Sequence, residues 1–255
     1  NEVLNPQGYD SSVDSQAQLA ALNSLRAQDL NSEVVAAASH ITDQAITVNS
    51  SMQTYQEITV DFPNTSLGNQ LKQVARIIKK RGDLNVTRQV FFCQLGGFDT
   101  HVLQINNHAN LLAQTSQAMR AFYDEMVVQG LSDKVTQFTM SDFSRTMNPS
   151  NAGLGVGTDH GWGNHQFVIG GGITSADFYG LNTPNGTPYP TLDLGGPDDA
   201  DSGSGARGRW IPTTSVEQYA ATLARWFGLP EANLINVFPR IGNFTNTNLG
   251  FMQSA

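Results

Sequence analysis

Three short segments, each carrying aspartate together with histidine or arginine, constrain most strongly what this chain can fold into. They are residues 97–101 (GFDTH), 141–146 (SDFSRT) and 157–165 (GTDHGWGNH). Each follows, or lies within, a turn after an apolar run, which is the pattern found where the strands of an α/β sheet end. We therefore expect the three segments to converge on one face, at the rim of a sheet.

The apolar periodicity around these segments favours alternating strands and helices. Helices are predicted over residues 1–60, 66–81, 104–129 and 214–227, and strands over residues 88–95, 134–140 and 166–169. This rhythm predicts an α/β fold with a mostly parallel sheet flanked by helices. We expect residues 1–255 to form a single domain, with a helical N-terminal part over residues 1–60 and an irregular surface loop over residues 180–210.

The side chains of the three segments predict a metal site. Aspartate and histidine hold hard or borderline divalent cations, and neighbouring glycines let the backbone bend close to a ligand. The candidate ligands are Asp99, His101, Asp142, Asp159, His160 and His165. Arg145 is a candidate clamp for an anionic group, although it could instead pair with Asp142. Without a metal, the aspartates could cap helices and the histidines could hydrogen-bond to them.

Charge and composition narrow the classes of partner and the location. The chain has 14 lysine and arginine residues against 22 aspartate and glutamate residues, and a formal net charge of −8. This balance argues against nucleic acid or an anionic membrane surface as the main partner. The low charged fraction of 14% and the loops rich in Asn, Thr, Ser and Gly are typical of an exported protein. We expect a periplasmic or extracellular protein whose export signal has been removed or lies outside this sequence.

Two further features bear on chemistry and location. No apolar stretch approaches the roughly 20 residues that a membrane-spanning helix needs, so no membrane span is expected. The single cysteine, Cys93, lies in the apolar run QVFFCQL. It is expected to be a buried, inert thiol rather than a nucleophile.

The ordered series of motifs resembles a known family. GFDTH followed by a long helix, SDFSRT, GTDHGWGNHQFVIGGG and GRWIPTTSVEQYAATLARWFGL together span residues 62–244. They resemble an exported bacterial domain-of-unknown-function family (number fifteen-oh-one). That family is commonly exported by the twin-arginine route and is placed in the alkaline-phosphatase and sulfatase superfamily. The resemblance implies a fold and a site location rather than a known reaction.

In that superfamily, a parallel sheet carries two divalent metals at its strand ends, beside a Ser, Thr or modified Cys nucleophile. By resemblance, Asp99 and His101 are similar to the Asp and His ligands of one metal. Asp142 resembles the aspartate after the next strand, and His160 or His165 resembles the late histidine. The resemblance thus implies bound Zn, Mn, Mg or Ca and attack on a phosphate or sulfate ester.

Two departures from the superfamily pattern leave alternatives open. The superfamily has Asp-His where this chain has Asp142-Phe143, so a single-metal or metal-free site is one alternative. Residues 1–60 also lack the strand that bears the nucleophile. Either the sheet is completed by a second polypeptide segment, or the site has no nucleophile.

Two functions follow from these alternatives. The first is an exported, metal-dependent hydrolase of a small anionic ester or of a sulfated or phosphorylated polymer. The second is a catalytically inactive binding or assembly module at the cell surface.

Overall fold

A computed structural model describes residues 11–53, 58–150, 153, 155–180 and 186–253. The chain divides into two compact units. The first unit comprises Asn1–Ile58 and Gln73–Phe91, and the second comprises Thr59–Lys72 and Phe92–Ala255. The three segments over residues 97–101, 141–146 and 157–165, called the Asp/His segments from here on although the second carries arginine in place of histidine, belong to the second unit. The expectation of a single domain stays a prediction.

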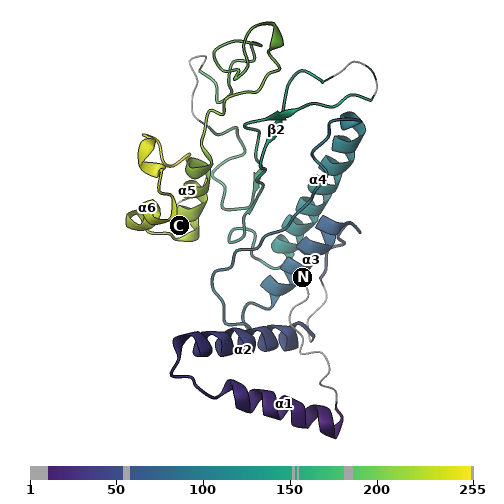
Figure 1. Ribbon diagram of the computed structural model, residues 1–255, viewed down its shortest axis with the longest axis vertical. Helices are drawn as coiled ribbons and strands as arrows, with labels where there is room; N and C mark the ends of the chain where they lie inside the picture. Colours follow the sequence, from purple (N-terminus) through teal and green to yellow (C-terminus); the bar gives the residue numbers. More distant parts are fainter. Residues whose placement is uncertain (1–10, 54–57, 151–152, 154, 181–185, 254–255) are drawn as a thin grey trace. The chain divides into compact units, whose positions relative to one another are not determined.

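The first unit contains two helices of the N-terminal region, α1 (Val13–Arg26) and α2 (Glu33–Gln53) (Figure 1). Helix α1 begins where the Ser12 hydroxyl accepts a hydrogen bond from the backbone N–H of Ser15. Contacts from the end of α1 join it to α2. Arg26 forms an ion pair with Asp43, and the Ser39 hydroxyl donates to the Arg26 carbonyl oxygen over 2.9 Å.

Helix α3 (Ser66–Lys79) begins at the predicted Ser66, and α4 (Gln104–Val128) matches the predicted long helix. Gly130, with a φ of 68°, follows α4, as the sequence predicted. The buried face of α4 supplies much of the core of the second unit. Its buried apolar residues are Ala118, Met119, Ala121, Phe122 and Met126.

The C-terminal helices form a second core cluster. Helix α5 (Val216–Phe227) begins with a capping box between Ser215 and Gln218, within the predicted helix over residues 214–227, and ends at Gly228 with a φ of 100°. Ala221 of α5 packs with Leu234 of α6 (Leu234–Val237). The short helices of this unit are η1 (Gly203–Gly205), η2 (Glu231–Asn233) and η3 (Ile241–Asn243).

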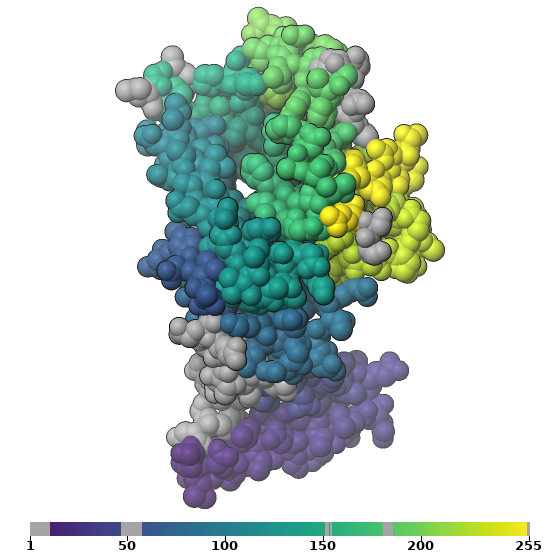
Figure 2. Space-filling model, turned by 180° about the vertical axis from the view of Figure 1, so that it is seen from behind, coloured from purple at the N-terminus to yellow at the C-terminus, as the bar shows by residue number. Residues whose placement is uncertain are grey.

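The C-terminal tail joins this unit through backbone pairing. Ile173 forms an antiparallel bridge with Met252, and the Gln253 N–H donates to the Gly172 carbonyl oxygen over 2.8 Å. Phe251, directly before Met252, is buried, and its carbonyl oxygen accepts a hydrogen bond from the Thr174 N–H over 2.9 Å. In Figure 2 this yellow segment lies against the green part of the chain.

The prediction of a mostly parallel, alkaline-phosphatase-like sheet flanked by helices is wrong. The described residues contain two small antiparallel sheets of two strands each. Strand β1 (Gln137–Phe138) pairs with β4 (Val168–Ile169). Strand β2 (Ser144–Arg145) pairs with β3 (His160–Gly161).

Connectivity explains this difference. Parallel neighbours need a crossover connection, usually a helix, whereas antiparallel neighbours need the chain only to turn back. Between β1 and β4 the described chain contains no helix; it turns back through β2 and β3.

The predicted strand over residues 88–95 is wrong for a different reason. It forms no strand among the described residues, and Val90 and Phe92 are 76% and 84% exposed. Apolar composition alone does not make a strand without a neighbour for its backbone groups.

Two smaller expectations can be compared with the structure. Cys93 is partly buried, and this burial raises the pKa of its thiol, as expected for an unreactive cysteine. Across the helices that the structure describes, none combines the length and the apolar character that crossing a bilayer requires.

A buried carboxylate on α4 fixes an irregular segment of the second unit. Glu125 is 0% exposed, and its Oε2 accepts hydrogen bonds from the backbone N–H groups of Thr59 and Val60, each over 3.0 Å. Its Oε1 accepts a hydrogen bond from the side chain of Gln129 over 2.9 Å. The carboxylate therefore supplies the acceptors that a neighbouring strand would otherwise supply.

Replacing Glu125 with alanine is expected to lower the free energy of unfolding by about 2–4 kcal/mol, because buried donors lose their acceptor. Urea denaturation would measure this change. The matched control is Arg120→Ala on the same helix, which removes an exposed ion pair with Asp124. The control should leave the free energy nearly unchanged. Equal effects of the two substitutions would contradict the role assigned to Glu125.

Candidate metal centre

The pairing of β2 with β3 brings the second and third Asp/His segments together. Arg145 lies opposite His160, and Ser144 lies opposite Gly161. Gly161 is buried, and a Cβ atom at this position would lie 2.4 Å from the Ser144 hydroxyl oxygen. The glycine therefore permits the close approach of the two strands.

A second set of backbone contacts brings the first segment against the third. Val102 forms an antiparallel bridge with Val156, and the Thr158 N–H donates to the Thr100 carbonyl oxygen over 3.3 Å. Between them, Gly157 lies so close that a Cβ atom there would be 2.2 Å from the carbonyl carbon of His101. The three segments thus meet, as the sequence predicted, but through antiparallel contacts instead of parallel strand ends.

Three side chains converge at this meeting point. Asp99, His101 and His160 each offer a ligand atom, and these atoms lie within 4.8 Å of one another. The Nε2 atom of His160 lies 2.8 Å from Asp99 Oδ1, and the Nε2 atom of His101 lies 3.1 Å from the same oxygen. Each side chain is about half exposed, at 51–53%. The group is therefore accessible from solvent.

Arg145 anchors Asp99. Its Nη1 donates to Asp99 Oδ1 over 2.8 Å, its Nε donates to the Thr158 hydroxyl over 3.0 Å, and its Nη2 donates to the Thr158 carbonyl oxygen. The Arg145 side chain is only 11% exposed. Hydrogen bonds from His160 and Arg145 lower the pKa of Asp99 below its usual value. Arg145 therefore forms its ion pair with Asp99 rather than with Asp142.

Phe143 orients His160. The two rings stack with their centroids 4.2 Å apart and their planes 19° apart. The guanidinium carbon of Arg145 lies 5.6 Å from the centroid of the Phe143 ring. The residue that replaces an expected histidine ligand thus packs against another histidine of the group.

Asp159 supports His101 from its other side. The Nδ1 atom of His101 lies 3.5 Å from Asp159 Oδ1, while Ser150 donates to the same oxygen and Arg207 lies 3.1 Å from Oδ2. Burial by itself would raise the pKa of Asp159. The hydrogen bond from Ser150 and the charge of Arg207 outweigh this effect, so the pKa is lowered.

Three of the six candidate ligands from the sequence lie outside this group: Asp159, which contacts it through His101, and Asp142 and His165. Asp142 is exposed and is not among the residues whose ligand atoms converge. His165 is also exposed, and its ring lies 5.6 Å from that of Tyr189. Asp142 and His165 belong to the sequence motifs, but their side chains do not reach the group formed by Asp99, His101 and His160.

Sequence reasoning missed two arginines in the loop over residues 180–210. Arg207 contacts Asp159, and Arg209 donates through Nε to the His160 carbonyl oxygen over 3.0 Å. Asp201 of the same loop accepts a hydrogen bond from the Arg207 backbone N–H over 3.1 Å and forms an ion pair with Arg209. Buried Asp199 accepts backbone hydrogen bonds from Gly195, Asp201, Gly208 and Arg209. The run of aspartates was the available signal, because aspartate often organises loops through backbone N–H groups.

The donor set fits a divalent transition metal. Two imidazole nitrogens and one carboxylate oxygen are typical ligands of Zn²⁺ or Mn²⁺, whereas Mg²⁺ and Ca²⁺ prefer oxygen ligands alone. A carboxylate beside the second nitrogen of a metal-binding histidine is a common supporting contact. Asp159 provides this contact to His101. Asp99, His101 and His160 therefore form a candidate metal site, with Asp159 as its support.

Replacing Arg145 with methionine is expected to raise the pKa of Asp99 toward its usual value of 3.8, because one hydrogen-bonding cation is lost. A carboxyl-carbon NMR titration would measure this pKa. With a lowered pKa, Asp99 contributes stability above its unfolded-state pKa, and the contribution is lost as the pH falls through the folded-state pKa. The variant should therefore lose less stability on acidification.

The matched control is Arg207→Met, which removes the cation beside Asp159. It should raise the pKa of Asp159 and leave that of Asp99 in place. If both variants shifted Asp99 equally, a direct role of Arg145 would be excluded.

Comparison with known proteins bears on the family of the chain. Comparison with curated proteins and with solved structures gave no match. A family model matches residues 2–188, which is well over half of the 255 residues and includes all three Asp/His segments. The chain therefore belongs to the family described as protein of unknown function (DUF1501).

Proposed function

We propose that this chain is a metal-dependent hydrolase of phosphate or sulfate esters, and that its metal ligands are Asp99, His101 and His160. The observation that carries the proposal is the convergence of their ligand atoms within 4.8 Å on an exposed surface. Exposure matters because an ester must reach the site. An Asp/His cluster with a purely structural role would not need to be exposed to solvent.

A divalent cation at this position would neutralise charge on phosphoryl or sulfuryl oxygens and lower the pKa of a bound water. The protein supplies ligands that are ready to bind. Asp99 has a lowered pKa, so it is ionised at neutral pH, as a metal ligand must be. Arg145 and Phe143 hold Asp99 and His160 in place, and Asp159 holds His101.

The local charge also favours an anionic substrate. The carboxylates of Asp99 and Asp159 are balanced by the guanidinium groups of Arg145 and Arg207. A divalent cation would therefore leave two excess positive charges at the site. A phosphate monoester dianion would balance them, and a sulfate monoester anion would balance one.

The alternative is a catalytically inactive binding or assembly module at the cell surface. One observation favours it: Arg145 is already engaged with Asp99 and Thr158, so it is not free to clamp a transferred group. Kinship with the alkaline-phosphatase and sulfatase superfamily, twin-arginine export and a periplasmic or extracellular location are also proposals. Motif order supports the kinship, and composition supports export. Fractionation of cells that express the natural gene would test the location.

Direct metal binding is the first test. Calorimetry with Zn²⁺ and Mn²⁺ should show one site per chain, and His160→Ala should weaken binding by about 100-fold or more, because one of three protein ligands is lost. The matched control is His165→Ala, which removes an exposed histidine outside the group. Equal losses in the two variants would exclude the assigned ligand set.

Turnover is the second test. Metal-loaded protein should hydrolyse 4-nitrophenyl phosphate or 4-nitrophenyl sulfate, and Asp99→Asn should abolish the activity, because the carboxylate ligand is lost. Asp142→Asn, at an exposed position outside the group, should retain activity. Metal binding without any turnover would leave the binding module as the function.

A further inference from the structure

Helix α4 starts directly from the backbone contacts that gather the candidate metal centre. Val102 forms an antiparallel bridge with Val156, and the Leu103 N–H donates to the Gly155 carbonyl oxygen over 3.1 Å. The N–H of Gln104, the first residue of α4, donates to the Val156 carbonyl oxygen, also over 3.1 Å. The backbone of Gln104 is therefore fixed against the chain that leads into the third Asp/His segment.

This start of the helix is unfavourable by local criteria. Leu103 has a φ of 53° and a ψ of 31°, in the left-handed region that costs a residue other than glycine about 1–2 kcal/mol. A leucine side chain also has no oxygen to accept hydrogen bonds from the first N–H groups of the helix, which Ser, Thr, Asp or Asn would supply. Tertiary contacts therefore decide where α4 begins, and they place Gln104 against Thr158.

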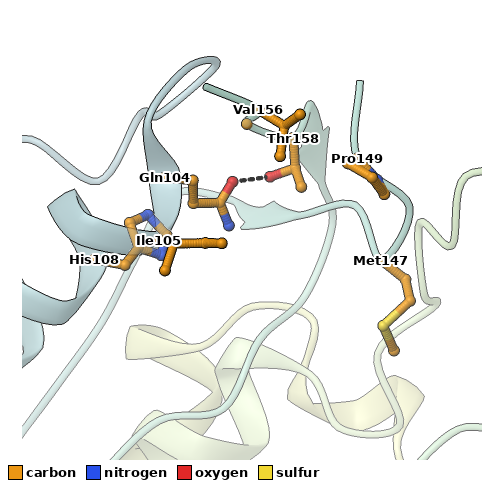
Figure 3. Close-up of a pocket in the computed structure, with 8 residues that line it drawn as sticks. Gln104, Ile105, His108, Met147, Pro149, Val156 and Thr158 are labelled. Carbon is orange, nitrogen blue, oxygen red and sulfur yellow. Dashed lines mark hydrogen bonds between the residues drawn. The ribbon is translucent and has the colours of Figure 1, made fainter. Parts of the chain in front are cut away.

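Gln104 fixes the direction of the Thr158 hydroxyl. Both side chains lie on the wall of a small pocket, and Figure 3 shows them pointing toward one another, joined by a dashed line. The hydroxyl donates to Gln104 Oε1 over 2.6 Å and accepts from Arg145 Nε over 3.0 Å. A hydroxyl has a single proton, and an arginine N–H can only donate. The amide oxygen of Gln104 therefore holds that proton away from Arg145.

Thr158 in turn sets the plane of the Arg145 guanidinium. It accepts twice, through its hydroxyl from Nε and through its carbonyl oxygen from Nη2. Because the guanidinium is planar and rigid, two contacts along one edge fix the direction of Nη1, which donates to Asp99 Oδ1 over 2.8 Å. Thr158 is 8% exposed and the Arg145 side chain is 11% exposed, so water is poorly placed to replace a lost contact.

We infer that Gln104 is a positioning residue of the candidate metal centre. Through Thr158 and Arg145, it determines where Asp99 Oδ1 stands relative to the two imidazoles. This inference rests on the proposed function, because it takes Asp99 as a metal ligand. It assigns a part in metal binding to a residue outside the three Asp/His segments.

Calorimetry with Mn²⁺ on the full-length protein and its variants tests the inference. Gln104→Met removes the acceptor with little change in size and should weaken Mn²⁺ binding about fivefold, somewhat less than the roughly 10–100-fold typical of groups that contact a metal ligand directly. Gln104→Glu keeps an acceptor oxygen and should bind Mn²⁺ at least as tightly as the wild type. The matched control is Gln117→Met, the same exchange at an exposed position later in α4, which should leave the affinity unchanged.

A double-mutant cycle separates this role from a general weakening of α4. If Gln104 acts through Arg145, Gln104→Met should cause no further loss of Mn²⁺ affinity in protein that already carries Arg145→Met. An unchanged affinity in Gln104→Met, an equal loss in Gln104→Glu, or the same loss in both backgrounds would overturn the inference, while Mn²⁺ binding by the wild type would still support the centre. Failure of the wild type to bind Mn²⁺ would overturn the proposed function and the inference with it.

Discussion

One carboxylate oxygen organises the functional surface of this protein. Asp99 Oδ1 lies within 3.1 Å of His160 Nε2, His101 Nε2 and Arg145 Nη1. These groups come from three segments that are far apart in the sequence, so the oxygen also marks where the segments meet. The arginine is nearly buried and tied to Thr158, whereas the two imidazoles are open to solvent. Arg145 thus contacts Asp99 from the protein interior, whereas His101 and His160 contact it where solvent has access.

Two glycines make this convergence sterically possible. Gly157 lets the third segment approach the backbone of His101, and Gly161 lets β3 approach Ser144 of β2. A side chain at either position would overlap atoms that lie under 2.5 Å away. Gly157 and Gly161 of the motif GTDHGWG therefore allow neighbouring segments to approach closely, and they do not mark the end of a strand in a parallel sheet. Asp99, His101 and His160 are gathered without the parallel sheet that the family resemblance implied.

Local signals in the sequence predicted local structure, and partners in space decided the rest. The predicted bounds of α4 and α5 agree with the structure to within two residues. Gly130 follows the end of α4, and Ser215 and Gly228 mark the two ends of α5, because helix ends often depend on nearby residues. The motifs also indicated that Asp99, His101 and His160 belong together. The strand direction, the separation of Asp142 and His165 from the group, and the contribution of Arg207 depend on tertiary contacts. None of these contacts leaves a periodic trace in the sequence.

Asp199 is the most heavily hydrogen-bonded of the aspartates that support the loop carrying Arg207 and Arg209. Asp199 gathers four backbone N–H groups around a single side chain, while Ser202, Gly203 and Ser204 at its outer turn face solvent. Ordering such a long segment is entropically costly, and the four hydrogen bonds to Asp199 offset part of that cost. The outer turn can therefore vary in sequence or length while the two arginines keep their positions. Variation in the outer turn is thereby separated from the support of Arg207 and Arg209.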